Sequence, residues 1–379
     1  MEPTLYEIVV AFEEALNFWL LHLSDVNTEF KAAVSPAKVD APLEELVKIS
    51  KLIKAHTTKV GILFEPSSFK NAGSAAVKTV SELSSSFVLY VSVLAQLSPA
   101  AISRLFHREI FSVSTSLITN ARLLVSELLV IIKENENETA TSDTTGKPED
   151  TPSLNDATDP KATVDPRLVS VGKVWASCDE MVKLIEAGNL RYLEKQTKMH
   201  LTLIDDGLDE FSEWAENPEE FDDEDPFGFE DEFSDEEDDE SPPVGEEESD
   251  SEETNTSSQE KEKLRSYCKL WLEKFKLVRL LFFSINKSLP LLVGGESIDE
   301  IYAAQELISR DIDQLIVDIM LSQVIDHVVE KHATNIDKGC YKIVKILKGV
   351  NEKSPTKVKC ALWESKFKEL LDEMYNSIE

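Results

Sequence analysis

The side chains in this chain best able to do chemistry are its histidines and cysteines, and their spacing matches no catalytic or metal-binding pattern. The six histidines are His22, His56, His107, His200, His327 and His332, and none forms the His-Glu-x-x-His pair of a zinc protease. The four cysteines are Cys178, Cys268, Cys340 and Cys360, whose wide spacing favours unpaired buried thiols over a zinc site. The chain also has no glycine-rich phosphate loop and no Gly-x-Ser-x-Gly nucleophile elbow. We therefore predict a protein that is not an enzyme and needs no metal or cofactor.

Carboxylates are concentrated in one acidic segment. Between Glu216 and Glu253 there are 22 Asp or Glu residues, and no Lys or Arg occurs from Met199 to Glu260. These residues supply most of the formal net charge of −33. A segment of this composition cannot bury enough apolar surface to offset the entropy lost on ordering. We therefore predict that residues 216–258 are disordered and serve partners rather than a substrate.

Apolar and phosphorylatable side chains are spaced through this charge. The candidate partner anchors are Phe221, Phe227, Phe229 and Phe233, and the candidate phosphorylation sites are Ser234, Ser249 and Ser251. Phosphorylation there would deepen the negative charge rather than create a fold. Three interpretations stay open: a solubilising linker, a partner-binding segment in which carboxylates steer the encounter, or a segment that shields histones and other basic proteins.

Lysines gather near the carboxyl end, where Lys338, Lys342 and Lys345 would share one helix face. Such a face could bind nucleic acid, but it has no Arg and few interleaved aromatic residues. The negative charge of the whole chain also opposes binding to a phosphate backbone. We expect a solvated face that contacts the acidic segment transiently, and no direct nucleic-acid binding.

Helical spacing of apolar residues recurs through both halves of the chain, and no stretch alternates with the period of a strand. Residues 1–134 and 166–215 together predict one bundle of about six helices, interrupted by a flexible polar loop at 135–165. The acidic segment at 216–258 separates this bundle from a helical region at 259–379, which packs on it or forms a second bundle. The predicted fold class is all-α, a multi-helix bundle broken by two disordered loops.

Two features of the sequence, its amino terminus and the length of its apolar runs, indicate where in the cell the protein is expected. The chain begins Met-Glu-Pro-Thr and lacks the basic and apolar regions of a signal peptide. No uninterrupted apolar run approaches the roughly 20 residues of a membrane helix. We expect a cytoplasmic and nuclear protein without membrane contact, and the sequence predicts no oligomeric state.

The stretch Val171–Asp179, with the sequence VGKVWASCD, resembles a signature of the cyclin-D-binding protein family. This family is also described as maternal Id-like or Grap-adaptor-and-cyclin-D-interacting proteins. The resemblance rests on a Val-Trp-x-x-Cys core at the start of a helix. The segments LTLIDDGLDEF at 201–211 and Asp-Pro-Phe-Gly at 225–228 follow in the expected order, and HTTKVGILF at 56–64 looks like the end of the second helix of the family.

The resemblance implies a non-catalytic, all-helical protein that binds D-type cyclins or helix-loop-helix factors and restrains cell-cycle progression. Within the motif, the spacing of Val174 and Cys178 predicts core positions, and Trp175 flanks this stripe where it can seal the bundle. We therefore expect all three to be structural. The alternative function is an acidic chaperone-like or scaffold protein that binds basic partners through residues 216–253.

Overall fold

The computed structural model describes residues 3–23, 30, 33–66, 69, 72–142, 165–216, 253–289, 294–350 and 355–378. Throughout these ranges the regular structure is helical and no strand occurs, so the predicted all-α class is confirmed. Most of the two predicted loops, residues 143–164 and 217–252, lies outside the described residues. The helices on either side run a few residues into the predicted loops, because α6 ends at Ser142 and α8 begins at Glu253.

The chain forms two compact units, Met1–Tyr192 and Leu193–Glu379. Helix α7 (Pro166–Glu216) contributes its first part to one unit and its second part to the other. Within α7, Gly188 has φ 80° and ψ 171°, a left-handed conformation that interrupts the helix and that glycine adopts without strain. Residues 193–215, which the sequence analysis assigned to the first bundle, thus lie in the second compact unit.

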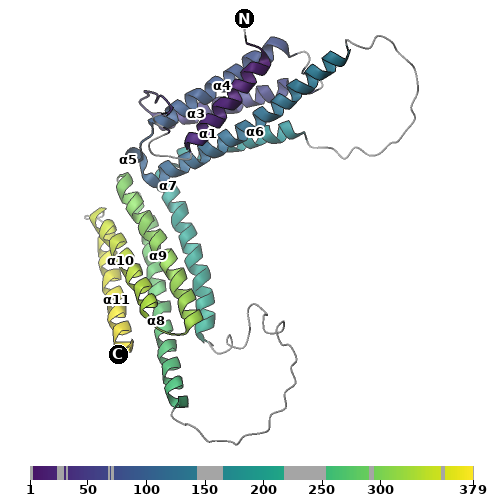
Figure 1. The fold of residues 1–379 in the computed structure, drawn as a ribbon. Helices are drawn as coiled ribbons and strands as arrows, with labels where there is room; N and C mark the ends of the chain where they lie inside the picture. The colour runs from purple at the N-terminus through teal and green to yellow at the C-terminus, as the bar shows by residue number, and fades with distance from the viewer. Residues whose placement is uncertain are drawn as a thin grey trace, which may run out of the picture. The chain divides into compact units, whose positions relative to one another are not determined.

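The first unit contains α1 (Leu5–Leu23), α3 (Pro42–Leu63), α4 (Gly73–Gln96), the short α5 (Pro99–Ile102) and α6 (Arg104–Ser142). Helices α3 and α4 pack together, and α1 packs on both α4 and α6 (Figure 1). The rings of Phe12 and Phe87 lie 5.6 Å apart in this core. The hydroxyl groups of Tyr90 and Ser114 lie 2.7 Å apart, which satisfies two buried polar groups between α4 and α6.

Local sequence explains where the helices of this unit begin. Thr4 and Glu7 form a capping box before α1: the Thr4 hydroxyl accepts from the Glu7 amide at 3.3 Å, and the Glu7 carboxylate accepts from the Thr4 amide at 2.8 Å. Helix α3 begins at Pro42, whose missing amide hydrogen costs nothing in the first turn. The Ser103 hydroxyl accepts from the Phe106 amide at 3.1 Å at the start of α6.

The second unit joins the end of α7 to α8 (Glu253–Ser288), α9 (Gly295–Ser322), α10 (His327–Val350) and α11 (Pro355–Ile378). Helix α9 packs on α10, and α8 packs on α10 and α11. The aromatic seam of α8 forms the centre of this core, with the rings of Trp271 and Phe275 5.1 Å apart and Phe275 6.1 Å from Phe211 of α7. The indole of Trp363 donates to the Leu277 carbonyl at 2.7 Å and ties α11 to α8.

Two helices in the first unit are long and apolar enough to cross a membrane when judged by length and composition alone. They are α4 and the part of α6 from Arg104 to Asn137. Their most apolar stretches are 50% and 44% buried inside the protein, because they form the core of a bundle. Any core helix of this length has the same property, so it carries no argument for a membrane location.

Candidate interaction surfaces on α7

The first half of α7 packs closely against α3 at Gly61. A Cβ atom placed at Gly61 would lie 3.1 Å from Cγ2 of Val171, which is tighter than ordinary van der Waals contact. A glycine at this position therefore lets the two helices approach. Val171 opens the VGKVWASCD motif, so the motif begins at this contact.

Arg167 fixes the first turn of α7 to the end of α3. Its guanidinium is buried, donates to the Gly61 carbonyl, and pairs with Asp165 at 2.7 Å between Nη2 and Oδ2. The hydrogen bond from Arg167 holds the pKa of the Asp165 carboxyl below its usual range. Arg167 was not predicted from the sequence, although its position four residues before Val171 and seven before Val174 places it on the same apolar stripe.

Ion pairs continue along the same seam. Lys54 Nζ lies 2.6 and 2.7 Å from the two oxygens of Asp179, and Lys51 Nζ lies 3.3 Å from Glu186. These pairs are exposed, so each contributes less than about 1 kcal/mol to stability. Their order along the two helices shows that α3 and α7 run antiparallel. The seam thus holds α7 at one register and in one rotation about its axis.

The structure divides the three motif residues that the sequence predicted to be structural. Val174 is 0% and Cys178 1% exposed, and burial raises the pKa of the Cys178 thiol to about 12. Trp175 is 36% exposed, so it lies at the edge of the buried stripe rather than within it. Trp175 lies four residues after Val171 and four before Asp179, on the side of α7 that faces the edge of α3 rather than the centre of the core.

Three apolar side chains lie on the solvent side of the α3–α7 contact and define what we call the Trp175 surface. They are Ile62, Leu168 and Trp175, which are 67%, 54% and 36% exposed. Gly172 lies on the same face of α7, between Leu168 and Trp175. Apart from the neighbouring backbone of α7, no residue that the structure describes comes within 4 Å of a Cβ atom placed there. The Trp175 surface therefore combines exposed apolar side chains with open space at Gly172.

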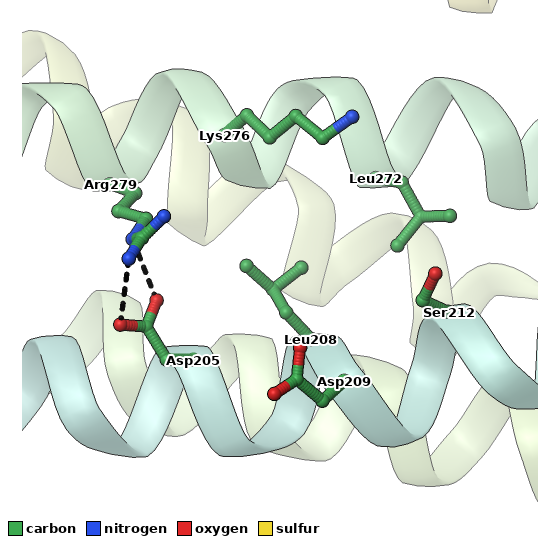
Figure 2. A pocket seen from close by; sticks show the side chains of 7 residues that line it. All are labelled: Asp205, Leu208, Asp209, Ser212, Leu272, Lys276 and Arg279. Carbon is green, nitrogen blue, oxygen red and sulfur yellow. Dashed lines mark hydrogen bonds and ion pairs between the residues drawn. The ribbon is translucent and has the colours of Figure 1, made fainter.

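The second half of α7 forms a groove with α8, which we call the α7–α8 groove (Figure 2). It encloses about 330 Å³, and Leu208 and Leu272 lie between the two helices. The walls carry opposite charges, acidic on α7 and basic on α8. Arg279 joins them, with its Nε 2.7 Å from Asp205 Oδ1 and its Nη2 3.1 Å from Asp205 Oδ2. This bidentate geometry fixes the Arg279 side chain across the groove.

A serine, a histidine and a carboxylate meet in the first unit in an order that could suggest nucleophilic catalysis. Ser86 Oγ lies 3.0 Å from His56 Nδ1, and His56 Nε2 lies 3.7 Å from Glu82. However, the buried Ser86 hydroxyl also lies 2.8 Å from the backbone carbonyl of Glu82, to which it donates. A nucleophile must reach a substrate and pass its proton to the histidine. This cluster instead satisfies a histidine packed against the core.

The remaining predicted residues fall in different places. The acidic-segment residues Phe221, Phe227, Phe229, Phe233, Ser234, Ser249 and Ser251 lie outside the described residues. Among the lysines of α10, Lys338 and Lys345 are exposed, and Lys342 lies 3.9 Å from Glu300 of α9. All four cysteines are free and buried. Within the described ranges, no group of three His, Cys, Asp or Glu side chains is placed to hold a metal ion.

Comparison with known proteins adds two findings. An uncharacterized protein of Saccharomyces cerevisiae (strain ATCC 204508 / S288c), YLR287C, is 24% identical over 345 residues, which cover 87% of this chain and 86% of the yeast protein. Residues 154–217 match the family model described as Grap2 and cyclin-D-interacting, N-terminal. The match contains the whole of α7, including Trp175 and the acidic wall of the α7–α8 groove. It confirms the resemblance seen in the VGKVWASCD motif and supports a cyclin-D-interacting-like family for this all-helical chain.

Proposed function

We propose that this chain is a non-catalytic regulator that binds a protein partner through the Trp175 surface. The observation that carries the proposal is the exposure of Trp175, a large aromatic side chain on a fixed helix inside the family-matched segment. A core role would account for a buried tryptophan but gives no reason for one whose ring meets solvent. Tryptophan is among the residues that most often dominate the binding energy of an interface.

The packing beneath this surface favours binding. Arg167, Gly61 and the Lys54–Asp179 pair hold α7 in place before any partner arrives. A preorganised face loses little conformational entropy on association, so more of the contact energy appears as affinity. The open space at Gly172 lets an apolar side chain of the partner reach the helix backbone between Leu168 and Trp175.

The family description makes a D-type cyclin the first partner to test. The resemblance of the VGKVWASCD motif adds helix-loop-helix proteins as the second. In this proposal the chain acts in the cytoplasm and nucleus and restrains cell-cycle progression by occupying such a partner. Phosphorylation at Ser234, Ser249 or Ser251 would modulate the encounter through charge.

The sharpest test adds a side chain instead of removing one. Gly172→Gln places a bulky polar group in the centre of the Trp175 surface, where the described residues outside this turn of α7 leave the new Cβ atom more than 4 Å of space. The fold should therefore be kept, and binding of a purified D-type cyclin should weaken about tenfold or more. The matched control is Gly349→Gln on α10, which also has open space around it.

Calorimetry of cyclin binding and thermal unfolding of each variant give the two readouts. Trp175→Ala should weaken binding in the same way, with a smaller loss of stability than a buried tryptophan would show. Wild-type affinity in both Gly172→Gln and Trp175→Ala would rule out the Trp175 surface. Equal loss in Gly349→Gln would show that the effect does not depend on position.

The alternative of an acidic chaperone or scaffold rests on the 22 carboxylates between Glu216 and Glu253. A chain lacking residues 217–252 separates the two functions. The regulator should keep its cyclin affinity, whereas a chaperone should lose binding to core histones. Histone binding should also weaken steeply with salt, because exposed charges are screened within about 10 Å at 0.1 M.

A further inference from the structure

The outer face of α8 carries an excess of positive charge within a strongly negative protein. Residues 262–289 contain seven Lys or Arg and two Glu, whereas the whole chain has a formal charge of −33. The opposite side of this helix is the buried aromatic seam, including Trp271, Phe275 and Phe282. Lys274 is buried against Asp337, and the other six Lys or Arg lie outside the core, so most of the positive charge is displayed to solvent.

Five exposed side chains share this outer stripe and define the α8 basic face. They are Lys269, Lys276, Leu280, Phe283 and Lys287. Their spacing places them within a narrow sector of the helix, over a length of about 27 Å. Leu280 is 56% and Phe283 44% exposed, so two large apolar side chains lie among three lysines.

The α7–α8 groove lies beside this face and supports it. The Arg279 guanidinium, held by Asp205, lies 5.7 Å from the centre of the Phe283 ring and restrains that ring. Leu208 and Leu272 line the groove between the two helices (Figure 2). A bound peptide that runs along α8 can therefore place apolar side chains on Leu280, on Phe283 and on the end of the groove at Leu272.

We propose that the α8 basic face docks an acidic protein segment that carries large apolar side chains. Carboxylates of such a segment match Lys269, Lys276 and Lys287, and its apolar side chains cover Leu280 and Phe283. This inference concerns a second surface, in the other compact unit, and does not depend on whether the Trp175 surface binds a cyclin.

Charge also argues against broader anionic partners. The α7 wall of the groove presents Asp205 and the exposed Asp209 next to the basic face. A nucleic-acid duplex or an anionic membrane is wide enough to cover both helices, so it would meet these carboxylates. A single peptide is narrow enough to follow α8 alone. Lys276 forms an exposed ion pair with Glu273, and a competing carboxylate can replace Glu273 in it.

The experiment uses the full chain and a fluorescein-labelled peptide of the sequence Glu-Asp-Phe-Glu-Asp-Phe-Glu-Asp, titrated by fluorescence anisotropy at low and moderate salt. We expect micromolar binding that weakens with salt. The triple variant K269E/K276E/K287E should weaken it about tenfold or more. The matched control K331E/K338E/K345E makes the same charge change on exposed lysines of α10 and should keep the affinity within about twofold.

The apolar contribution has its own pair of variants. Phe283→Ser should weaken binding, whereas Val317→Ser on α9, at a similarly exposed position, should not. A second peptide with Ser in place of both Phe should bind the wild-type chain more weakly. Circular dichroism and thermal unfolding confirm that each variant keeps its helices.

Several results would overturn the proposal. If the α10 control loses as much affinity as the α8 triple variant, the effect comes from net charge and not from the α8 basic face. If the peptide without Phe binds as tightly as the original peptide, Leu280 and Phe283 do not contribute to binding. Tighter binding to an oligonucleotide or to phosphatidylserine vesicles would assign the face to another class of partner. Binding only after deletion of residues 217–252 would assign it to the chain's own acidic residues.

Discussion

Lys274 Nζ lies 2.6 Å from Asp337 Oδ1 in the core of the second unit, where the lysine side chain is 1% exposed. The ammonium also lies 4.2 Å from the centre of the Trp271 ring and 5.4 Å from that of Phe367. One charged group therefore joins α8, α10 and α11. Burial lowers the pKa of Lys274 and raises that of Asp337, and the attraction between the two opposes both shifts.

Removing one partner of this pair should destabilise the protein strongly. Lys274→Met keeps most of the volume but leaves the Asp337 carboxylate buried without its counter-charge. We expect a loss of about 3–5 kcal/mol in the free energy of unfolding, measured by urea denaturation at neutral pH with tryptophan fluorescence. The double variant Lys274→Met/Asp337→Leu should recover most of this loss, because no buried charge remains.

The exposed pair on the same helix provides the control for this prediction. Lys276 lies 2.6 Å from Glu273, and both side chains are exposed. Lys276→Met should therefore change the free energy of unfolding by less than about 1 kcal/mol. If Lys274→Met and Lys276→Met have the same free energy of unfolding, Asp337 either reaches solvent or becomes protonated without loss of stability.

Two glycines of α10 should respond to the same substitution in opposite directions. A Cβ atom at Gly339 would lie 2.7 Å from Cγ1 of Ile308 in α9, so Gly339→Ala forces the two helices apart. At Gly349, by contrast, no described residue beyond the backbone of α10 itself comes within 4 Å of such a Cβ atom. We expect Gly339→Ala to lose about 1–3 kcal/mol and Gly349→Ala to gain up to about 1 kcal/mol through helix propensity.

Urea denaturation of the two single variants tests this difference. Adding Ile308→Ala to Gly339→Ala should restore part of the loss relative to the sum of the single effects, because it removes the atoms that clash. If both glycine variants gain stability, α9 and α10 have room to move apart, and the close approach at Gly339 is not needed.

Periodicity predicted the helices and most of their buried faces because burial in a bundle repeats with the turn of the helix. The seam of α8 from Leu264 to Ile285 is an example, as its members are buried in the predicted order. Spacing did not predict the exposed fraction of Trp175, since it identifies the centre of a buried face but not how far a neighbouring helix covers its edge. Only the position of α3 decides that.

Charged residues within the core were also missed, although the sequence held a signal for them. Lys274 lies three residues after Trp271 and four before Val278, which is core spacing. Asp311 lies three residues after Ile308 and four before Leu315, and it is buried with His332 Nδ1 2.7 Å from its carboxylate. A charge on a core stripe predicts a buried partner, but that partner comes from another helix and cannot be named from spacing alone.

The division of the chain could not be predicted either. Gly188 was one glycine among the 12 of the chain, and nothing in its neighbours shows a left-handed conformation. Burial along α7 stops after Met181 and resumes at Tyr192, but a gap of this kind does not show that the two halves face different cores. The break becomes visible only when the partners of Val174 on one side and Phe211 on the other are known.

The four cysteines should resist alkylation in the folded protein. Burial raises the pKa of the Cys178 and Cys268 thiols to about 12, and it raises those of Cys340 and Cys360 as well. The thiolate is the reactive form, so the folded chain offers iodoacetamide very little nucleophile at pH 8. Mass spectrometry should find almost no carbamidomethylation without denaturant and four modified cysteines in urea. Rapid labelling of any one would show that its helix opens readily.

The last prediction concerns pH and His200, which is buried beside Tyr302, with neither ring nitrogen hydrogen-bonded to any group that the structure describes. Burial lowers its pKa below the usual 6.5, and the nearby Glu306 opposes this shift. As the pH falls through about 6.5, His200 therefore becomes protonated in the unfolded chain while it stays neutral in the folded chain. The contribution of His200 to stability is complete above that pH and falls as the pH drops below it, by at most about 1.4 kcal/mol per pH unit.

His200→Leu removes this titrating group and its two unsatisfied nitrogens, so the variant should be up to about 1 kcal/mol more stable than the wild type at pH 7.5. Its stability should also fall less than that of the wild type between about pH 7 and about pH 5. Urea denaturation at several pH values measures both effects, and equal slopes for the two proteins would show that His200 takes up its proton in the folded state as readily as in the unfolded one.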